Sequence, residues 1–147
     1  MPLSPSLYLW VKVVHLLGIV LWISGIWAGI WLLKAHANVD AVSRPAMVGA
    51  ERKVGASMDA GATLALIGGL LMAFGGPINA FKTGGWLHIK LTLVVLGIFS
   101  VHGLVRGRMR KFRNGDLTPL PGWVVPVLLV SVIGSIALGA NPMLLRK

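Results

Sequence analysis

One stretch decides the fold of this chain, and it reads Gly85-Trp86-Leu87-His88-Ile89-Lys90-Leu91-Thr92, followed by mainly apolar residues as far as His102. Its length and composition predict a helix that crosses a membrane, because about 20 apolar residues span the hydrocarbon core of a bilayer. The stretch nevertheless contains two histidines and a lysine. A charged side chain at the centre of a bilayer costs about 2.5 to 3.5 kcal/mol on insertion scales. Each of these groups is therefore expected to have a partner, a water-filled cavity or a ligand.

The spacing of these residues predicts which of them share a side of the helix. His88 and His102 are fourteen residues apart, which at 100° per residue brings them within about 40° of one another and separates them by about 21 Å along the axis. We therefore expect both imidazoles on one face, at opposite ends of the span. Lys90 lies about 200° from His88 and is expected on a different face, together with Val94 and Gly97.

The composition of the whole chain indicates its class. The 147 residues are 56% hydrophobic and 12% charged, with a mean hydropathy of +0.81, which is typical of an integral membrane protein. The net charge of +10 comes from basic residues beside apolar segments, which favours topology and anionic-lipid contact over nucleic-acid binding. The absence of cysteine excludes disulfides, thiolate metal sites and covalent haem attachment. Histidine and lysine must therefore supply the chemistry of any site.

Four apolar segments predict four spans, at residues 7–33, 58–74, 86–105 and 123–140. The first is too long for the core of a signal peptide and follows no basic region, so we expect it to remain as a span. The chain should form an all-α, four-helix bundle as one domain over residues 1–147, a multi-pass protein of the cell (inner) membrane. Residues 34–57 should form an interfacial helix or an ordered loop. Basic residues gather in the first and third connections, so the positive-inside rule predicts both termini outside the cytoplasm.

The first predicted span also contains ionisable groups. Lys12 and His15 begin a stripe at three- and four-residue spacing that continues through Ile19 and Trp22 and should face the bundle. Lys12 lies near the end of the span and could extend its ammonium to the surface. His15 could either bind a ligand or form a hydrogen bond to a neighbouring helix. His36 lies in the first connection, where a solvated histidine and a metal ligand are the two alternatives.

Small residues predict close helix contacts. Gly25 and Gly29 have the G-x-x-x-G spacing, which lets the backbone of another helix approach. The second predicted span contains Gly61, Gly68 and Gly69, which indicate either tight packing or room for a flat ligand beside the helix.

Imidazoles that face a bundle interior, without cysteine, favour haem b as the cofactor, because histidine can hold haem iron without a covalent attachment. The spacing of His88 and His102 is also similar to that of b-type cytochromes that hold two haems across a bilayer. Copper is the alternative metal, although a soft site would contain more methionine or some cysteine.

Three segments resemble one family of membrane proteins. They are Tyr8-Leu9-Trp10-x-Lys12-x-x-His15, Gly85-Trp86-Leu87-His88-x-Lys90-Leu91, and His102-Gly103 with the following Arg106-x-Arg108-x-Arg110-Lys111-Phe112. These segments are similar to those of HemJ-type protoporphyrinogen IX oxidases, within the wider HemJ/CopD-like membrane proteins. The resemblance implies a small bundle that binds haem b, oxidises protoporphyrinogen IX to protoporphyrin IX, and passes electrons to a quinone or a respiratory partner.

The resemblance also implies roles for individual residues. His15 would be a haem ligand and Lys90 a functionally essential, catalytic partner, and His88 and His102 also match the family's motifs. Two alternatives stay open: a b-type cytochrome that transfers electrons without acting on a porphyrinogen, and a copper transporter of the CopD type. Homo-oligomerisation is a further expectation, because histidines shared across a dimer could supply axial ligands that one chain lacks.

Overall fold

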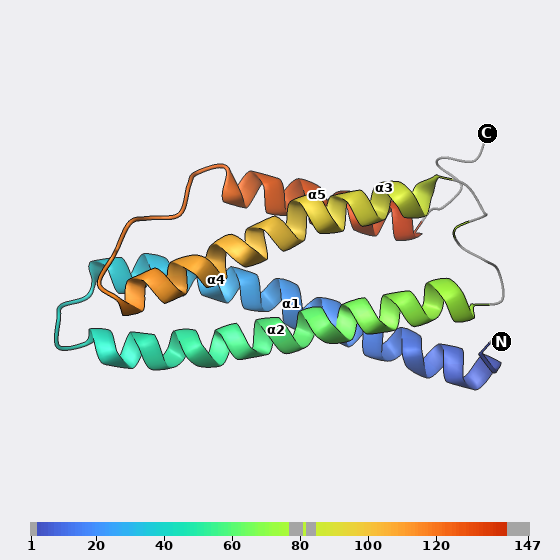
Figure 1. The fold of residues 1–147 in the computed structure, drawn as a ribbon, viewed down its shortest axis with the longest axis horizontal. Coiled ribbons are helices and arrows are strands. Elements are labelled where there is room, and N and C mark those ends of the chain that lie inside the picture. Colours follow the sequence, from blue (N-terminus) through green and yellow to red (C-terminus); the bar gives the residue numbers. More distant parts are fainter. Residues whose placement is uncertain (1–2, 77–80, 82–84, 141–147) are drawn as a thin grey trace.

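The computed structural model describes residues 3–76, 81 and 85–140. Within them the chain forms helices α1 (Pro5–Asn38), α2 (Arg44–Gly75), α3 (Trp86–Thr92), η1 (Leu93–Phe99), α4 (Ser100–Arg113) and α5 (Val124–Ala140). Because α3, η1 and α4 follow one another as a single helix, the result is a bundle of four antiparallel helices (Figure 1). The predicted all-α four-helix bundle is confirmed.

Three of the four helices are long and apolar enough to cross a membrane, namely Pro5–Asn38, Arg44–Gly75 and Trp86–Arg113. The fourth, α5, is apolar but has only 17 residues. The protein is therefore a multi-pass membrane protein. The two predicted basic connections lie at the same end of the bundle, opposite the start of α1 (Figure 1), as an up-and-down arrangement of four helices requires.

The first two helices are longer than their predicted spans. The segment expected to be an interfacial helix or loop instead continues α1 to Asn38 and begins α2 at Arg44. A short turn joins the two helices, and in it the backbone N–H of Ser43 donates a 2.8 Å hydrogen bond to Oδ1 of Asp40. Residues 34–57 thus form the closed end of a helical hairpin.

Glycines that alternate between α1 and α2 let the two backbones approach closely. A Cβ atom added at Gly25 would lie 3.0 Å from Cβ of Met58, and one added at Gly68 would lie 2.8 Å from Cβ of His15. In lipid, where apolar burial does not drive helix association, such close contact is a main source of stability. The predicted tight packing is confirmed for these glycines.

The core lies where the hairpin meets α4. Trp22 and Ile26 of α1, Met58 of α2, and Val105 and Met109 of α4 are all at most 3% exposed. The helix α5 packs against η1, α3 and α4, and α4 in turn contacts α1 and α2. The two halves of the bundle are therefore joined through α4.

The central helix is not α-helical throughout. Its segment η1 is a π-helix, in which hydrogen bonds run from i to i+5 and each turn contains more residues than an α-helical turn. The expectation that His88 and His102 share a face assumed 100° per residue along the whole span. The π-helical segment breaks that assumption, and the two imidazoles have different surroundings, as described below.

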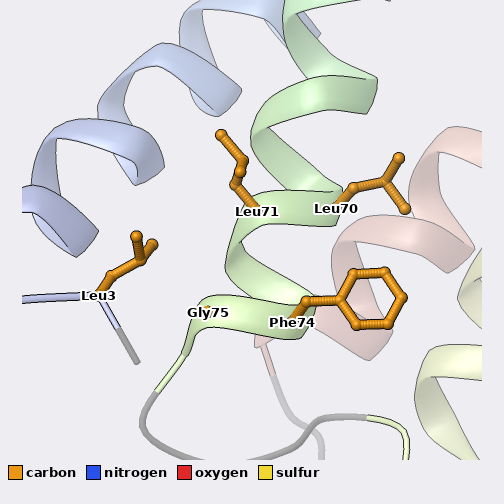
Figure 2. A pocket seen from close by; sticks show the side chains of 5 residues that line it. All are labelled: Leu3, Leu70, Leu71, Phe74 and Gly75. Carbon is orange, nitrogen blue, oxygen red and sulfur yellow. The ribbon is translucent and has the colours of Figure 1, made fainter. Parts of the chain in front are cut away.

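An open apolar hollow lies at the end of the bundle where α1 begins and α2 ends (Figure 2). Leu3, Leu70, Leu71, Phe74 and Gly75 line it. The backbone N–H of Leu3 donates a 2.8 Å hydrogen bond to the carbonyl of Gly75, which ties the start of α1 to the end of α2. None of the predicted site residues lines this hollow.

Candidate functional site

His15 is half-buried on α1, its ring lies against Gly69 of α2, and its backbone lies against Gly68. Its Nδ1 atom lies 2.6 Å from the carbonyl oxygen of Ala65. A carbonyl oxygen can only accept, so Nδ1 carries a proton, and in the neutral imidazole Nε2 then keeps its lone pair. This is the tautomer of a histidine that ligates a metal through Nε2, with the second nitrogen held by a backbone carbonyl. Among the described residues, Nε2 has no hydrogen-bond partner.

Lys90 is half-buried on α3, next to α5. A Cβ atom added at Gly139 would lie 3.3 Å from its Nζ atom. Within the part of the chain that the structure describes, the ammonium forms no hydrogen bond or ion pair. His15 and Lys90 thus lie in the same half of the bundle, where α1 and α3 begin (Figure 1).

His102 has both ring nitrogens engaged. The indole Nε1–H of Trp22 donates to Nδ1 at 3.0 Å, which places the proton on Nε2, because an indole nitrogen can only donate. Nε2 lies 3.2 Å from Oδ1 of Asp59, and the other carboxylate oxygen lies 2.9 Å from the guanidinium of Arg106. Phe99 lies beside both rings, 5.0 Å from Trp22 and 5.9 Å from His102 between centroids. In this arrangement His102 connects three helices and has no free nitrogen for a metal.

The other two histidines, His88 and His36, differ in burial and in partners. The side chain of His88 is exposed at the start of α3, with its ring centroid 6.0 Å from that of Phe81. His36 is 1% exposed, and its Nδ1 atom lies 2.7 Å from Oε1 of Glu51. Phe112 contacts the His36 ring edge-on. The alternative of a solvated His36 is therefore wrong.

The stripe that begins with Lys12 and His15 faces the bundle and becomes more buried along α1. Lys12 is exposed at its outer end, His15 and Ile19 are half-buried, and Trp22 is buried. No group of three or more histidine, aspartate or glutamate side chains that could hold a metal ion is present among the described residues. The candidate site is therefore a single histidine, His15, with Lys90 in the same half of the bundle.

Sequence reasoning missed the two acidic partners, Glu51 and Asp59. Glu51 lies in the segment expected to connect the first two spans, and Asp59 lies at the edge of the predicted second span. The signal that could have found Glu51 is the hairpin itself, because a short turn brings the end of α1 and the start of α2 together and so places His36 near Glu51.

Curated relatives identify the family. Proteins from two strains of Helicobacter pylori, each named protoporphyrinogen IX oxidase, are 34% and 36% identical to this chain over 110 residues, which is 73% of this chain and 73% of each relative. A protein of the same name from Synechocystis is 29% identical over 115 residues, which is 74% of this chain. The match spans only 54%, or about half, of that relative's length.

No family model and no solved structure matches the chain. The Helicobacter relatives exceed 30% identity over most of their length. The residues that carry the resemblance, among them His15, Lys90 and His102, lie in described helices. The chain therefore belongs to the family of HemJ-type protoporphyrinogen IX oxidases.

Proposed function

We propose that this protein oxidises protoporphyrinogen IX to protoporphyrin IX, with haem b held at His15 as its redox cofactor. The name of its relatives supports the substrate. The observation that carries the proposal is the half-buried His15, whose Nδ1 is held by the carbonyl of Ala65 and whose Nε2 has no hydrogen-bond partner among the described residues. Lys90, in the same half of the bundle, likewise has no hydrogen-bond or ion-pair partner among them.

The residues around His15 fit a haem. Nε2 would hold the iron, and the 2.6 Å hydrogen bond to Ala65 would fix the ring orientation and tautomer. Gly69 leaves room for the imidazole itself, because a Cβ atom there would lie 3.1 Å from Cε1 of His15. When bound, haem supplies a one-electron redox centre whose potential depends on its axial ligand and on burial. His102 is the weaker ligand candidate, because Trp22 and Asp59 occupy both of its nitrogens.

Lys90 would bind an acidic group at this site. A lysine ammonium within an apolar span requires an anionic partner or water, and the propionates of a porphyrin or a porphyrinogen are carboxylates of this kind. Such a contact would orient the macrocycle relative to His15. His88, exposed on the same short helix, would lie at the rim of the site.

The reaction also needs an acceptor. Oxidation of the porphyrinogen removes electrons and protons in equal number, and a quinone dissolved in the lipid takes up both as it becomes a quinol. We therefore propose a quinone or a respiratory partner as the electron acceptor.

Two measurements test the proposed function. The purified protein should show a Soret band and sharp α-bands on reduction, and its gene should restore growth to a strain that lacks protoporphyrinogen oxidase. A folded, colourless protein would contradict the haem assignment and leave copper transport as the alternative. Haem without complementation would instead favour an electron-transfer cytochrome.

Lys90→Ala separates the roles of the lysine. We expect the variant to fold and to lose turnover, with Lys90→Arg partly restoring it, because arginine also pairs with a carboxylate. Lys12→Ala is the matched control, since Lys12 is an exposed lysine in the same half of the bundle. Equal turnover of Lys90→Ala and the control would remove Lys90 from the mechanism.

A further inference from the structure

The helix α5 carries two buried serines in an otherwise apolar sequence. Ser131 is 4% exposed and Ser135 is 7% exposed. The hydroxyl of Ser135 has no hydrogen-bond partner among the described residues, so it does not bond to a carbonyl of the preceding turn, as a serine within a helix often does. Buried polar groups are nearly always paired. This hydroxyl is therefore a group whose partner lies outside the described part of the chain.

Three contacts show how α5 lies against α3 and η1. The contacting pairs are Lys90 with Gly139, Leu93 with Gly134, and Gly97 with Ser131. We call this line of contact the α3–α5 seam. Ser131, Ser135 and Gly139 follow one another at intervals of four residues, so they share one face of α5. Ser135 therefore lies in the seam, between the levels of Lys90 and Gly97.

Lys90 enters the same seam from α3. Its Nζ atom lies beside Gly139, where an added Cβ atom would be 3.3 Å away, and it forms no hydrogen bond or ion pair with the described residues. Lys90 is half-buried and Gly139 is exposed, so a ligand can reach the seam at this level. Ser135 is one turn of α5 farther in, about 6 Å along the axis. An ammonium and a hydroxyl, both without a described partner, thus lie one helical turn apart.

These two groups fit a carboxylate. An ammonium can only donate hydrogen bonds and a hydroxyl can also donate, and donation to an anionic oxygen gives short, strong hydrogen bonds of about 2.7 Å. The two oxygens of one carboxylate can bridge donors that lie one helical turn apart. A neutral ligand would leave the charge of Lys90 uncompensated in an apolar span, which is costly.

We propose that Lys90 and Ser135 together bind one carboxylate in the α3–α5 seam, and that this carboxylate is a propionate of the porphyrinogen. The choice of the porphyrinogen rests on the proposed function, whereas the subsite rests on the contacts of α3 and α5. Lys90 compensates the charge of the propionate. Ser135 sets its direction, because a serine hydroxyl is held close to the backbone, whereas the ammonium lies at the end of a flexible four-carbon chain.

Binding of protoporphyrin IX and of its dimethyl ester tests the subsite, because the ester has no free carboxylate. Each porphyrin is titrated with the purified protein in one detergent, and binding is followed by porphyrin fluorescence. The wild type should prefer the acid. Ser135→Ala should lower this preference roughly tenfold, since a hydrogen bond to a charged group contributes at least this much, and Lys90→Met should abolish it. A wild type without the preference, or a Ser135→Ala variant that keeps it in full, would overturn the proposal.

Ser131→Ala is the matched control, because it removes the other buried hydroxyl of α5, which packs on Gly97. It should keep the preference of the wild type for the acid. An equal loss of preference in the Ser131→Ala and Ser135→Ala variants would show that the loss comes from helix packing, which contradicts the proposal.

Thermal unfolding of the same variants separates a binding role of Ser135 from a structural one. Ser135→Ala removes a buried hydroxyl that has no partner among the described residues, so without a porphyrin it should unfold at the temperature of the wild type or above it. A lower unfolding temperature, together with equal losses of affinity for the acid and the ester, would assign the serine to the fold and overturn the proposal.

Porphyrin binding requires neither turnover nor an electron acceptor, so the subsite and the proposed reaction can fail separately. A protein that prefers the acid but does not restore growth to a strain without protoporphyrinogen oxidase would support the subsite and contradict the reaction. A protein that restores growth but binds the acid and the ester equally would contradict the subsite alone.

Discussion

Nε2 of His102 lies 3.2 Å from Oδ1 of Asp59, and the other nitrogen of the same ring accepts a hydrogen bond from Trp22. One imidazole therefore links α4 to both helices of the α1–α2 hairpin, among residues that are otherwise mostly apolar. Because Asp59 also binds Arg106, this carboxylate is the only acceptor shown for two donors of α4 within the described residues. It should contribute more to stability than an ordinary surface acid.

We predict that Asp59→Ala lowers the free energy of unfolding by about 1 to 3 kcal/mol, because His102 and Arg106 lose a charged acceptor. The measurement is equilibrium unfolding in mixed micelles. Asp116→Ala is the control, since Asp116 is exposed in the connection after α4 and surface substitutions usually change stability by less than about 0.5 kcal/mol. Similar losses in the two variants would show that the network adds nothing beyond a surface contact.

We predict that His15→Ala lowers the haem content of the purified protein by more than roughly tenfold, since loss of a group that merely orients a ligand already costs about 10- to 100-fold in metal affinity. Haem per chain is measured from the absorption of the pyridine complex. His88→Ala should keep most of its haem, because His88 is exposed and, among the described residues, its ring contact is with Phe81. Haem loss in His88→Ala with retention in His15→Ala would reverse the two assignments.

Features that depend on local composition could be predicted from the sequence. The four apolar segments became four helices, and Gly25 and Gly29 do face other helices, at Met58 and Met109. These predictions succeed because lipid selects apolar residues along a span and small residues where helices meet.

Features that depend on partners distant in sequence could not be predicted. From its composition, the charged start of α2 resembles a loop. The contact between Glu51 and His36 across the hairpin is not visible in the sequence. The π-helical segment has no marker in composition, and it lies where Gly97 packs directly on Ser131 of α5. For the same reason His102 looks like a free ligand in the sequence, although Trp22 and Asp59 occupy both of its nitrogens.

Two glycines of α2 should respond oppositely to alanine. Gly61→Ala should destabilise the protein by about 1 to 3 kcal/mol, because the added methyl would collide with the backbone of α1 at Leu21 and Trp22, and overpacking costs this much. Gly49→Ala should stabilise it by about 0.5 to 1 kcal/mol, because nothing lies within 4 Å and alanine favours a helix over glycine. Thermal unfolding of both variants measures the difference. A stabilising Gly61→Ala would mean that α1 and α2 are farther apart than described.

The buried pair of His36 and Glu51 should hold the closed end of the hairpin together. Both side chains are 1% exposed. Oε2 of Glu51 has no hydrogen-bond partner among the described residues, so the contact with His36 is the polar interaction that offsets the burial of this carboxyl group. We predict that His36→Ala destabilises the protein by about 3 to 5 kcal/mol, the usual loss when one partner of a buried pair is removed. The double variant His36→Leu, Glu51→Leu should recover most of that loss, because an apolar pair leaves no polar group unpaired. Unfolding of the single and double variants in mixed micelles tests this, and a double variant less stable than His36→Ala would show that the pair is worth more than apolar packing at this position.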